Sequence, residues 1–577
     1  MPPLDAADDH YGLRPHCGIC GGLMEIGEPF SLLRGNVDST AFSRRIGSFI
    51  FPDYGHLLPN TFGVRLCRKP GCSRCATSAE SSTVHSDCLD LVQQKCLLDK
   101  YLEQLWIITA WRVPWRCAPH FHLQETNVAL DFSKLEDLGI SRLRLLPREV
   151  LHIVYLYSAT SLFWRYNSAS ELARRLPILS SERRSVPLCA VVSWDRASQL
   201  TTSNAINHLP VLRLTIDSWG IKKVERLPEY PAFQGWRTEN LLFVVLQERD
   251  IEGVIAHLKF GCLRLELPNI IHGLQVWDTP SPPALNRCSF HPAGLSHSTQ
   301  FRTMQLGQTT GITFFFCFSE IYAIHAHTRR TPSAQSTYQL LSRRRQASVT
   351  WVYIPISGED YIALLGARMM DKSSAGCICL ILRMKLAGDV VVGFTYSQEA
   401  RYLVLSKSRP STIIYNTSQL RPISVIGAYT TQKDDNLPID PFRCPLIEKN
   451  PPFRDACFSL SPLNGTSRIR LFHDNDNGFC LGILLEFNNG AQRSLGQCRV
   501  GIDRSEDYQR PVCICFRPQS YTHPAISGLL QATTVTCTER QEHSHGSRDW
   551  TCFRLQGELE FWFSLYETRL KVIADQR

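Results

Sequence analysis

The spacing of cysteine and histidine in the first hundred positions constrains the fold of this chain more than any other feature. Cys17 and Cys20 form a C-x-x-C pair, and the two glycines that follow let the backbone turn sharply around the thiolates. His85 and Cys88 begin an amphipathic segment, and the first turn of a helix would place both on one face. Three thiolates and one imidazole suit the closed tetrahedral geometry of structural zinc. The sequence therefore predicts a zinc site formed by Cys17, Cys20, His85 and Cys88.

A second cluster of cysteines lies between these two pairs. Cys67, Cys72 and Cys75 have a C-x4-C-x2-C spacing, which supplies three ligands of a second zinc site. A short polar head has few apolar residues for a core of its own, which favours metal ligation over free thiols. Either metal would be structural, because four protein ligands leave no open coordination position. The candidates for the fourth ligand are Cys96, Cys117, His56, His120 and His122.

The cysteine-rich head is expected to span residues 1–125. Its knuckle followed by a helix-start pair resembles a treble-clef zinc module, the geometry that RING- and PHD-type fingers also use. A RING ubiquitin ligase would need a continuous eight-ligand cross-brace, and the gap of 46 residues between Cys20 and Cys67 argues against one. The tryptophan-rich segment 106–122 is expected to pack the head against its neighbour.

Length and composition indicate a globular protein of several domains. With 577 residues the chain is too long for one core, and 44% hydrophobic and 20% charged residues are ordinary values for a folded protein. The net charge of +9 falls short of a dedicated nucleic-acid binder, so nucleic acid is not favoured as a partner. The acidic residues 1–10 are not expected to act as a secretory signal, and no apolar run approaches the roughly 20 residues of a membrane span. We therefore expect a cytoplasmic or nuclear protein with mostly reduced cysteines and no membrane partner.

A helical hinge, expected at residues 140–185, follows the head. Pro147 suits the first helical position, where its missing N–H costs no hydrogen bond, and Glu149 suits the positive end of the helix dipole. Apolar residues at helical spacing follow, and a short polar stretch precedes a second helix. The side chains expected to face inward in the second helix are Leu162, Phe163, Tyr166, Ala169, Leu172, Ala173 and Leu176.

The Leu146-Pro147-Arg148-Glu149 opening, the short apolar helix, the turn and the second helix resemble the start of an F-box. F-box proteins dock a Skp-type adaptor through this helical piece and hold a target for ubiquitylation through a downstream domain. The resemblance therefore implies a Skp-type adaptor as a protein partner. The alternative is a helical joint that packs the head on the body.

Beyond the hinge the hydrophobic pattern shifts towards the alternation that is typical of strands. We expect a large, mainly antiparallel β body with a first part at residues 186–440 and a C-terminal part at residues 441–577. Stretches 311–327, 393–406 and 482–496 look alike and fit a unit of about forty residues, as in a degenerate propeller. Sandwich or prism-like sheets are the alternative. The clearest strand-like runs are residues 189–194, 211–216, 241–246, 262–267, 312–318, 349–356, 377–382, 389–396, 402–406 and 482–487.

Polar motifs in the body predict no further site. His325 and His327 alternate on a strand with no third ligand nearby, so we expect an exposed strand face. Residues 473–478 resemble a calcium loop, but the glutamate of position twelve is missing, so we expect a turn. His543 and His545 lie in a polar loop and are expected to face solvent. Hydrolase, P-loop, zinc-protease and kinase motifs are absent, and no catalytic or cofactor-binding residue is predicted.

The order of zinc head, helix pair and β body resembles a family of proteins from filamentous fungi, and that family brings no activity with it. The sequence favours a multidomain α+β chain that acts as a non-catalytic interaction or adaptor protein, in its sharper form an F-box-like substrate selector for ubiquitylation. A ligand-binding, lectin-like β-domain protein is the alternative. An enzyme of unrecognised type and DNA binding through the head are less favoured. The resemblance rests on residues 162–173, 276–283, 352–368 and 386–393.

Overall fold

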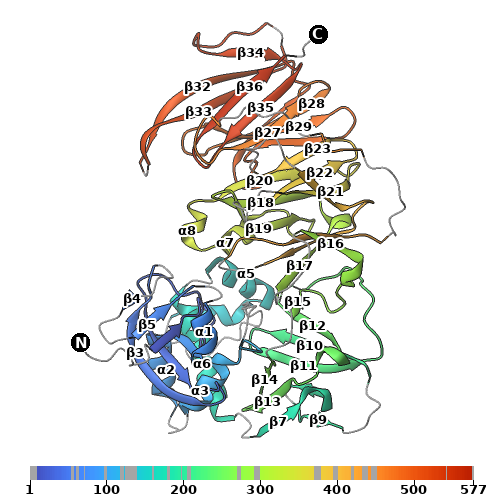
Figure 1. Ribbon diagram of the computed structural model, residues 1–577. Coiled ribbons are helices and arrows are strands. Elements are labelled where there is room, and N and C mark those ends of the chain that lie inside the picture. The colour runs from blue at the N-terminus through green and yellow to red at the C-terminus, as the bar shows by residue number, and fades with distance from the viewer. Residues whose placement is uncertain are drawn as a thin grey trace, which may run out of the picture. The chain divides into compact units, whose positions relative to one another are not determined.

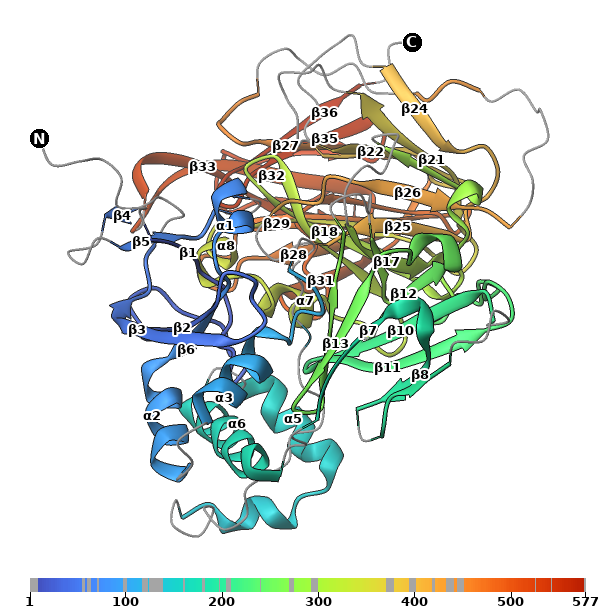
Figure 2. The same ribbon diagram turned by 60° about the horizontal axis from the view of Figure 1, so that its bottom comes forward.

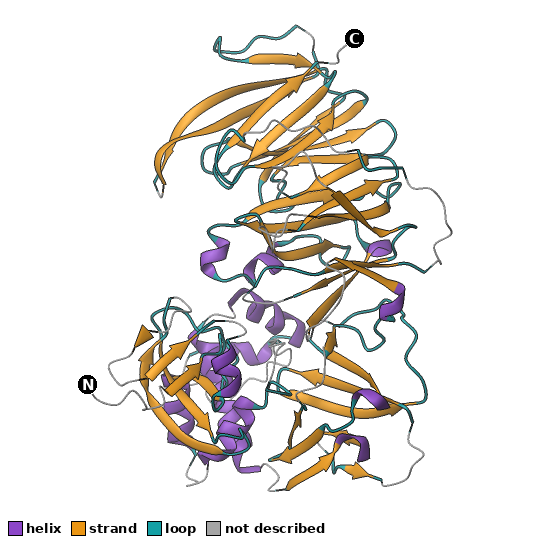
Figure 3. Cartoon of the chain, viewed as in Figure 1, coloured by secondary structure: helices purple, strands orange, loops and turns teal. Residues whose placement is uncertain are grey.

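The computed structural model is mostly β-sheet, and its longer helices fall within the first 180 residues (Figures 1 and 3). The chain divides into two compact units: unit 1 is Met1–Pro282 with Ser296–Gln300, and unit 2 is Pro283–Leu295 with Phe301–Arg577. The predicted α+β chain of more than one part is therefore confirmed, while the four predicted segments stay predictions. The structure describes residues 9–53, 58–59, 64–69, 72–96, 101–116, 123, 139–158, 161–178, 182–196, 198–203, 209–238, 240–268, 274–291, 299–369, 378–393, 401–417, 421–431, 440–443, 451–524, 526–540 and 542–574.

The described residues of the head of unit 1 form two small sheets and three helices. One sheet is antiparallel in the order β3-β2-β6, and α2 and α3 pack against it (Figure 2). The other has the order β1-β5-β4, in which β1 and β5 run parallel. The core between sheet and helices includes Phe30, Leu89 and Trp106, all fully buried. The elements are β1 (Asp9–Gly12), β2 (Pro29–Gly35), β3 (Phe42–Ile50), β4 (Leu58–Pro59), β5 (Val64–Cys67), α1 (Ser73–Thr77), β6 (Ser81–His85), α2 (Ser86–Lys95) and α3 (Tyr101–Ala110).

The predicted pair of helices is present as α5 (Arg148–Ser158) and α6 (Leu162–Arg175), after a 3-10 turn η1 (Ser141–Leu145). The second half of α6 joins the core of the head, as predicted for Ala169, Leu172, Ala173 and Leu176. The predicted inward orientation of Leu162 and Tyr166 is wrong, because both are exposed. The first turn of α6 instead buries Trp164 against α5, where its Nε1 donates a hydrogen bond to Ser158 Oγ at 2.8 Å.

The remainder of unit 1 forms further antiparallel strands that share cores with the head. Phe260, at the tip between β13 and β14, lies in the core of the head. Trp115 lies in the core of the neighbouring strands, so the tryptophan-rich segment does pack the head against its neighbour. The sheet orders are β14-β13-β7 and β15-β12-β10-β11-β8-β9. The elements are η2 (Leu176–Ile178), β7 (Arg183–Pro187), η3 (Leu188–Ala190), β8 (Val191–Asp195), β9 (Thr201–Thr202), β10 (Val211–Asp217), β11 (Gly220–Leu227), β12 (Leu242–Gln247), η4 (Glu248–Asp250), β13 (Ile255–Lys259), β14 (Cys262–Glu266) and β15 (Gln275–Trp277).

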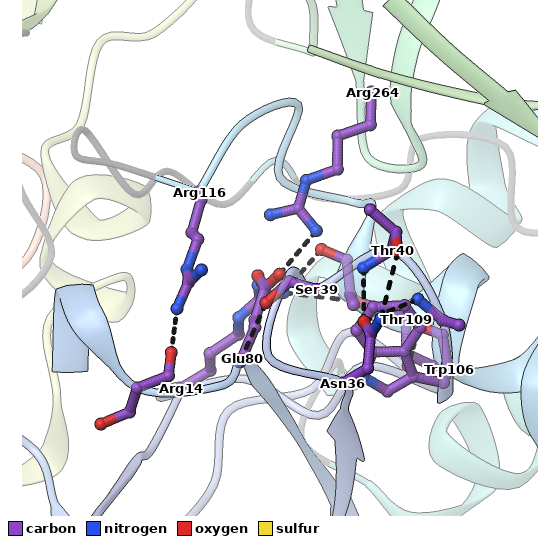
Figure 4. A network of polar contacts seen from close by, with 12 residues as sticks. Arg14, Asn36, Ser39, Thr40, Glu80, Trp106, Thr109, Arg116 and Arg264 are labelled. Carbon is purple, nitrogen blue, oxygen red and sulfur yellow. Dashed lines mark hydrogen bonds and ion pairs between the residues drawn. The ribbon is translucent and has the colours of Figure 1, made fainter. Parts of the chain in front are cut away.

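A buried ion-pair network also joins the head to strand β14 (Figure 4). The Glu80 carboxylate pairs with Arg14 and with Arg264, whose Nη1 lies 2.5 Å from Glu80 Oε2. The exposed fractions of the Glu80 and Arg264 side chains are only 9% and 6%. Although burial opposes ionisation, the charges of Arg264 and Arg14 hold the pKa of Glu80 below its usual value. Glu80 is therefore an ionised carboxylate that links two distant stretches of unit 1.

Unit 2 consists of small antiparallel sheets around a shared apolar core. Every strand-like run predicted for the body contains a strand, and the look-alike stretches 311–327 and 482–496 are hairpins. The third look-alike stretch, 393–406, lies partly outside the described residues. Among the described strands no sheet closes on itself, so the propeller stays a prediction. The sheet orders are β16-β26-β25-β17, β19-β18-β20, β23-β22-β21-β24, β27-β35-β36, β30-β29-β28-β31 and β33-β32-β34.

The bounds of the elements that complete the chain follow in chain order. They are η5 (Leu285–Arg287), β16 (Cys288–His291), β17 (Thr299–Gln305), η6 (Leu306–Gln308), β18 (Gly311–Cys317), β19 (Glu320–His327), α7 (Gln335–Gln339), α8 (Arg343–Gln346), β20 (Thr350–Pro355), β21 (Ile362–Met369), β22 (Cys379–Met384), β23 (Gly388–Val392), β24 (Arg401–Ser406), β25 (Thr412–Asn416), β26 (Ile426–Tyr429), β27 (Cys457–Pro462), β28 (Thr466–His473), β29 (Cys480–Phe487), β30 (Gln492–Gly496), β31 (Arg504–Gln509), β32 (Cys513–His523), β33 (Ile526–Thr538), β34 (Thr551–Arg554), β35 (Glu558–Phe563) and β36 (Thr568–Ile573). No helix among the described residues has the length and apolar composition to cross a bilayer.

Candidate metal centres

The first candidate centre begins at a tight turn between β1 and β2. The Gly21 amide donates a hydrogen bond to the Cys17 carbonyl, and the Cys17 amide donates one to the Gly22 carbonyl, both at 2.8 Å. Gly21 has φ +71°, a conformation that favours glycine. A side chain at Gly22 would bring its Cβ within 3.3 Å of Cys20 Sγ. The two glycines therefore hold Cys17 and Cys20 on the inside of a turn that larger residues would disturb.

His85 and Cys88 complete this centre from the junction of β6 and α2. His85 is the N-cap residue of α2, and Cys88 lies in its first turn. The Nδ1 atom of His85 lies 3.4 Å from Cys20 Sγ and 3.8 Å from Cys88 Sγ. A zinc ion with Zn–S near 2.3 Å and Zn–N near 2.0 Å would separate two tetrahedral ligands by about 3.6 Å. All four ligand atoms lie within 4.8 Å of one another, so the predicted set of Cys17, Cys20, His85 and Cys88 is brought together.

A carboxylate outside this centre orients the histidine. Glu28 Oε2 lies 3.1 Å from His85 Nε2, and Glu28 Oε1 accepts a hydrogen bond from Arg165 Nη2 at 2.6 Å. When Nε2 carries the proton that bonds to Glu28, the Nδ1 lone pair faces the three sulfurs. Partners of this kind fix the ring of a metal-binding histidine and raise its basicity. Arg165 belongs to α6, so this chain of contacts extends from the centre into the helix pair.

The charges in the first centre favour a cation among its sulfurs. Although burial opposes it, hydrogen bonds from Cys20, Cys88 and His85 lower the pKa of Cys17. The contact with Cys17 raises the pKa values of Cys20 and Cys88 in turn. Three thiols and one imidazole therefore share a buried space in which ionisation of Cys17 opposes ionisation of the other two sulfurs. A divalent cation would stabilise the remaining thiolates, since metal binding releases their protons.

The second candidate centre contains the three predicted cysteines and a histidine that the sequence did not suggest. His10 Nε2 lies 3.0 Å from Cys75 Sγ and 3.6 Å from Cys72 Sγ, and all four ligand atoms, with Cys67 Sγ, fall within 4.8 Å of one another. Parallel pairing of β1 with β5 brings His10 alongside Arg65, two positions before Cys67. Cys72 and Cys75 lie at the start of α1. This is again a closed Cys3His set, which suits structural zinc.

None of the residues expected as the fourth ligand of this centre is shown to be one. Cys96 is buried elsewhere, with its Sγ 3.7 Å from the Ala173 carbonyl oxygen. The other candidates, Cys117, His56, His120 and His122, lie outside the described residues. His10 is the candidate fourth ligand that the sequence did not indicate. It precedes the first knuckle by only a few positions, but nothing local to it resembles a metal-binding motif.

The ligands of the two centres alternate along the chain. His10 belongs to the second centre, Cys17 and Cys20 to the first, Cys67 to Cys75 to the second, and His85 with Cys88 to the first. Each centre therefore has ligands that lie between those of the other in sequence. The ligands of the two centres are interleaved along the sequence of the head and do not form two consecutive groups.

The histidine pair on β19 is less exposed than the sequence predicted. The predicted exposed face for His325 and His327 is wrong, because both are buried. His325 Nδ1 lies 2.8 Å from Thr337 Oγ1 and His327 Nδ1 lies 2.8 Å from the Pro332 carbonyl oxygen, so the segment that carries α7 covers this face. The predicted turn after His473 is confirmed.

His543 and His545, which we expected to face solvent, are partly exposed. Both are half-buried beside Cys515 and Cys552, which form a third group of candidate ligands with them.

Comparisons with known proteins do not add to this description. No protein-family model and no curated protein matches the chain.

Proposed function

We propose that the head is a structural module that binds two zinc ions. The single observation that carries this proposal is the convergence of two complete Cys3His sets within 4.8 Å. Four protein ligands leave no position for substrate, so the metals would stabilise the fold and take no part in catalysis. Zinc supplies no redox chemistry here, only four bonds that hold the knuckle, β1, β5 and the starts of α1 and α2 together.

Metal analysis of the full-length chain tests this proposal. Cys20→Ser and Cys72→Ser are each expected to lose about one zinc per chain relative to the parent, and the double variant about two, because each removes a ligand from a different closed set. Cys189→Ser is the matched control, since Cys189 is exposed and outside every cluster. A parent and a Cys20→Ser variant with equal zinc would contradict the first site.

We propose further that the chain is a non-catalytic interaction protein whose helix pair recruits a partner, with a Skp-type adaptor as its first candidate. An unusual concentration of exposed apolar side chains on η1, α5 and α6 supports this. The exposed fraction is 77% for Leu145, 51% for Ile153, 54% for Leu162 and 41% for Tyr166. Exposed apolar side chains gathered on neighbouring helices are a feature of protein interaction sites, and an amphipathic helix face is a common form of one.

A binding assay with a purified Skp-type adaptor tests this second part. Ile153→Asp and Leu162→Asp are expected to abolish binding, because each places a charge in a desolvated apolar contact. The control is Val37→Asp, which changes a still more exposed valine in the head, at 76% exposure. If the parent chain itself fails to bind the purified adaptor, the F-box-like form of the proposal is removed. Ser158 stands where the F-box pattern has a leucine, which makes this assay the decisive one.

A ligand-binding, lectin-like protein is the second candidate, and one cavity of unit 2 favours it. The cavity has a volume of about 340 Å³, and its lining includes Asp474, Arg504, Glu506 and Trp550. An aromatic ring beside a few convergent polar groups is typical of small-molecule sites. A glycan array without signal would argue strongly against a sugar ligand.

We also propose the finer features that the sequence suggested. The sheets that contain β18 to β24 and β27 to β36 would be blades of a degenerate propeller, which their three- and four-stranded antiparallel size supports. The chain would belong to the filamentous-fungal family that it resembles and act in the cytoplasm or nucleus, where thiolates stay reduced.

A further inference from the structure

A third group of metal ligands lies in unit 2, within the sheet β33-β32-β34. In the antiparallel pairing of β32 with β34, Cys515 stands directly opposite Cys552. Residues that face each other in this way project from the same side of a sheet, with Cβ atoms about 5 Å apart. Strand register alone therefore places two thiols side by side, and neither is in a disulfide.

The loop between β33 and β34 returns two histidines over these thiols. His543 Nε2 lies 3.1 Å from Cys515 Sγ and 3.2 Å from Cys552 Sγ. His545 Nε2 lies 3.2 Å from Cys552 Sγ. All four atoms fall within 4.8 Å of one another, and both imidazoles present the same nitrogen. Four donors on two strands and a loop thus converge on one point.

The neighbouring aromatic residue holds the second imidazole in this orientation. The ring of His545 stacks on the indole of Trp550, with centroids 4.6 Å apart and an angle of 13° between the planes. The guanidinium of Arg517 lies 5.4 Å from the same indole. This arrangement aligns the His545 ring before any ligand binds. Trp550 also lines the cavity beside His473, so the loop contributes to both places.

We propose that Cys515, His543, His545 and Cys552 bind a third zinc ion in a Cys2His2 site. Two thiolates and two imidazoles in a closed set are the donors that tetrahedral zinc selects. The site would be structural, fixing the loop that joins β33 to β34. It is independent of the two centres in the head, because its ligands all belong to unit 2.

Zinc analysis of the full-length chain tests the site. Cys552→Ser and the double variant His543→Ala/His545→Ala are each expected to lose about one zinc per chain relative to the parent. Cys20→Ser is expected to lose a different zinc, so the losses in Cys20→Ser/Cys552→Ser add up. Ser544→Ala is the matched control, because Ser544 is exposed and lies between the two histidines. Equal zinc in the parent and in both third-site variants would overturn the proposal.

Limited trypsin digestion gives a second readout that does not depend on counting metal. Arg540 and Arg548 are exposed on either side of the two histidines. Cleavage there is expected to be at least several-fold faster after chelation or in Cys552→Ser than in the zinc-loaded parent. Unchanged cleavage would contradict a metal that fixes the loop. If Cys552→Ser loses its fold by circular dichroism, His545→Ala supplies the same test. A Cys515–Cys552 disulfide in the non-reduced parent would also overturn the proposal.

Discussion

Glu28 would orient a ligand of the first candidate centre without binding a metal itself. It contacts His85 on one side and Arg165 on the other, and it is only partly exposed. Burial opposes its ionisation, but the hydrogen bonds from Arg165 and from the Glu25 amide hold the pKa of Glu28 below its usual value. Glu28 therefore remains an acceptor for the His85 ring at neutral pH.

Replacing this carboxylate should weaken the first zinc site without removing a ligand. Glu28→Gln is expected to lower the zinc affinity of that site by about 10- to 100-fold, the usual effect of losing such a partner. Competition with a chromophoric chelator measures it. Glu252→Gln, an exposed change in the same unit, is the control. An unchanged affinity would mean that the ring of His85 is held by packing alone.

At the scale of elements, the structure shows which parts of the sites were predictable. Cys17 with Cys20, and His85 with Cys88, are pairs within a few residues, so local spacing is sufficient to predict them. His10 reaches its site through parallel pairing of β1 with β5, which no local pattern announces. Cys515 and Cys552 likewise meet only through strand register.

Helix faces were harder to predict than helix positions. The bounds of α5 and α6 follow from Pro147 and from apolar spacing, and both helices are present. The burial of Trp164 and the exposure of Tyr166 depend on which neighbours cover each side of α6. The same limit explains His325 and His327, whose strand alternation was visible while the covering segment was not.

Strand β14 and the segment before β6 are joined by Glu80, and this contact can be tested as a unit. Glu80→Gln is expected to lower the free energy of unfolding of unit 1 by about 3–5 kcal/mol, because it leaves Arg14 and Arg264 as buried charges without a carboxylate. Urea denaturation followed by intrinsic fluorescence measures the change. Glu171→Gln is the control. Glu171 pairs with Arg174 at the surface, and its replacement should cost less than about 1 kcal/mol.

The difference in unfolding free energy between the parent and Glu80→Gln should change with pH in one direction only. The pKa of Glu80 is lower in the folded chain than in the unfolded chain. Its contribution is therefore fully present above the unfolded value, about 4.3, and is lost as the pH falls through the folded value. The gap between the parent and Glu80→Gln should stay constant from pH 6 to 8 and close in strong acid. A gap that widens in acid would contradict an ionised Glu80.

At the scale of the whole molecule, the sequence predicted what each part is made of better than where the parts divide. Each strand-like run of the body contains a strand, since alternation reports a half-buried sheet directly. The two compact units divide near residues 282–301, next to the proline-rich stretch 280–283. Within unit 2, strands that are far apart in the sequence pair with one another. For example, β27 pairs with β35 across about a hundred residues.

The alternating order of ligands in the head has a consequence for synthesis and for engineering. The segment from His10 to Cys75 and the segment from Cys17 to Cys88 overlap, so neither loop can be excised without opening the other. During translation, neither metal can be fully enclosed until most of the head has left the ribosome. Each metal would join residues that are far apart in the sequence, and closing such a long loop strongly restricts the unfolded chain. Because the two loops overlap, the second metal would close its loop in a chain that the first has already shortened. A cut between Cys20 and Cys67 divides both ligand sets, so the resulting fragments should lose both proposed zinc ions together.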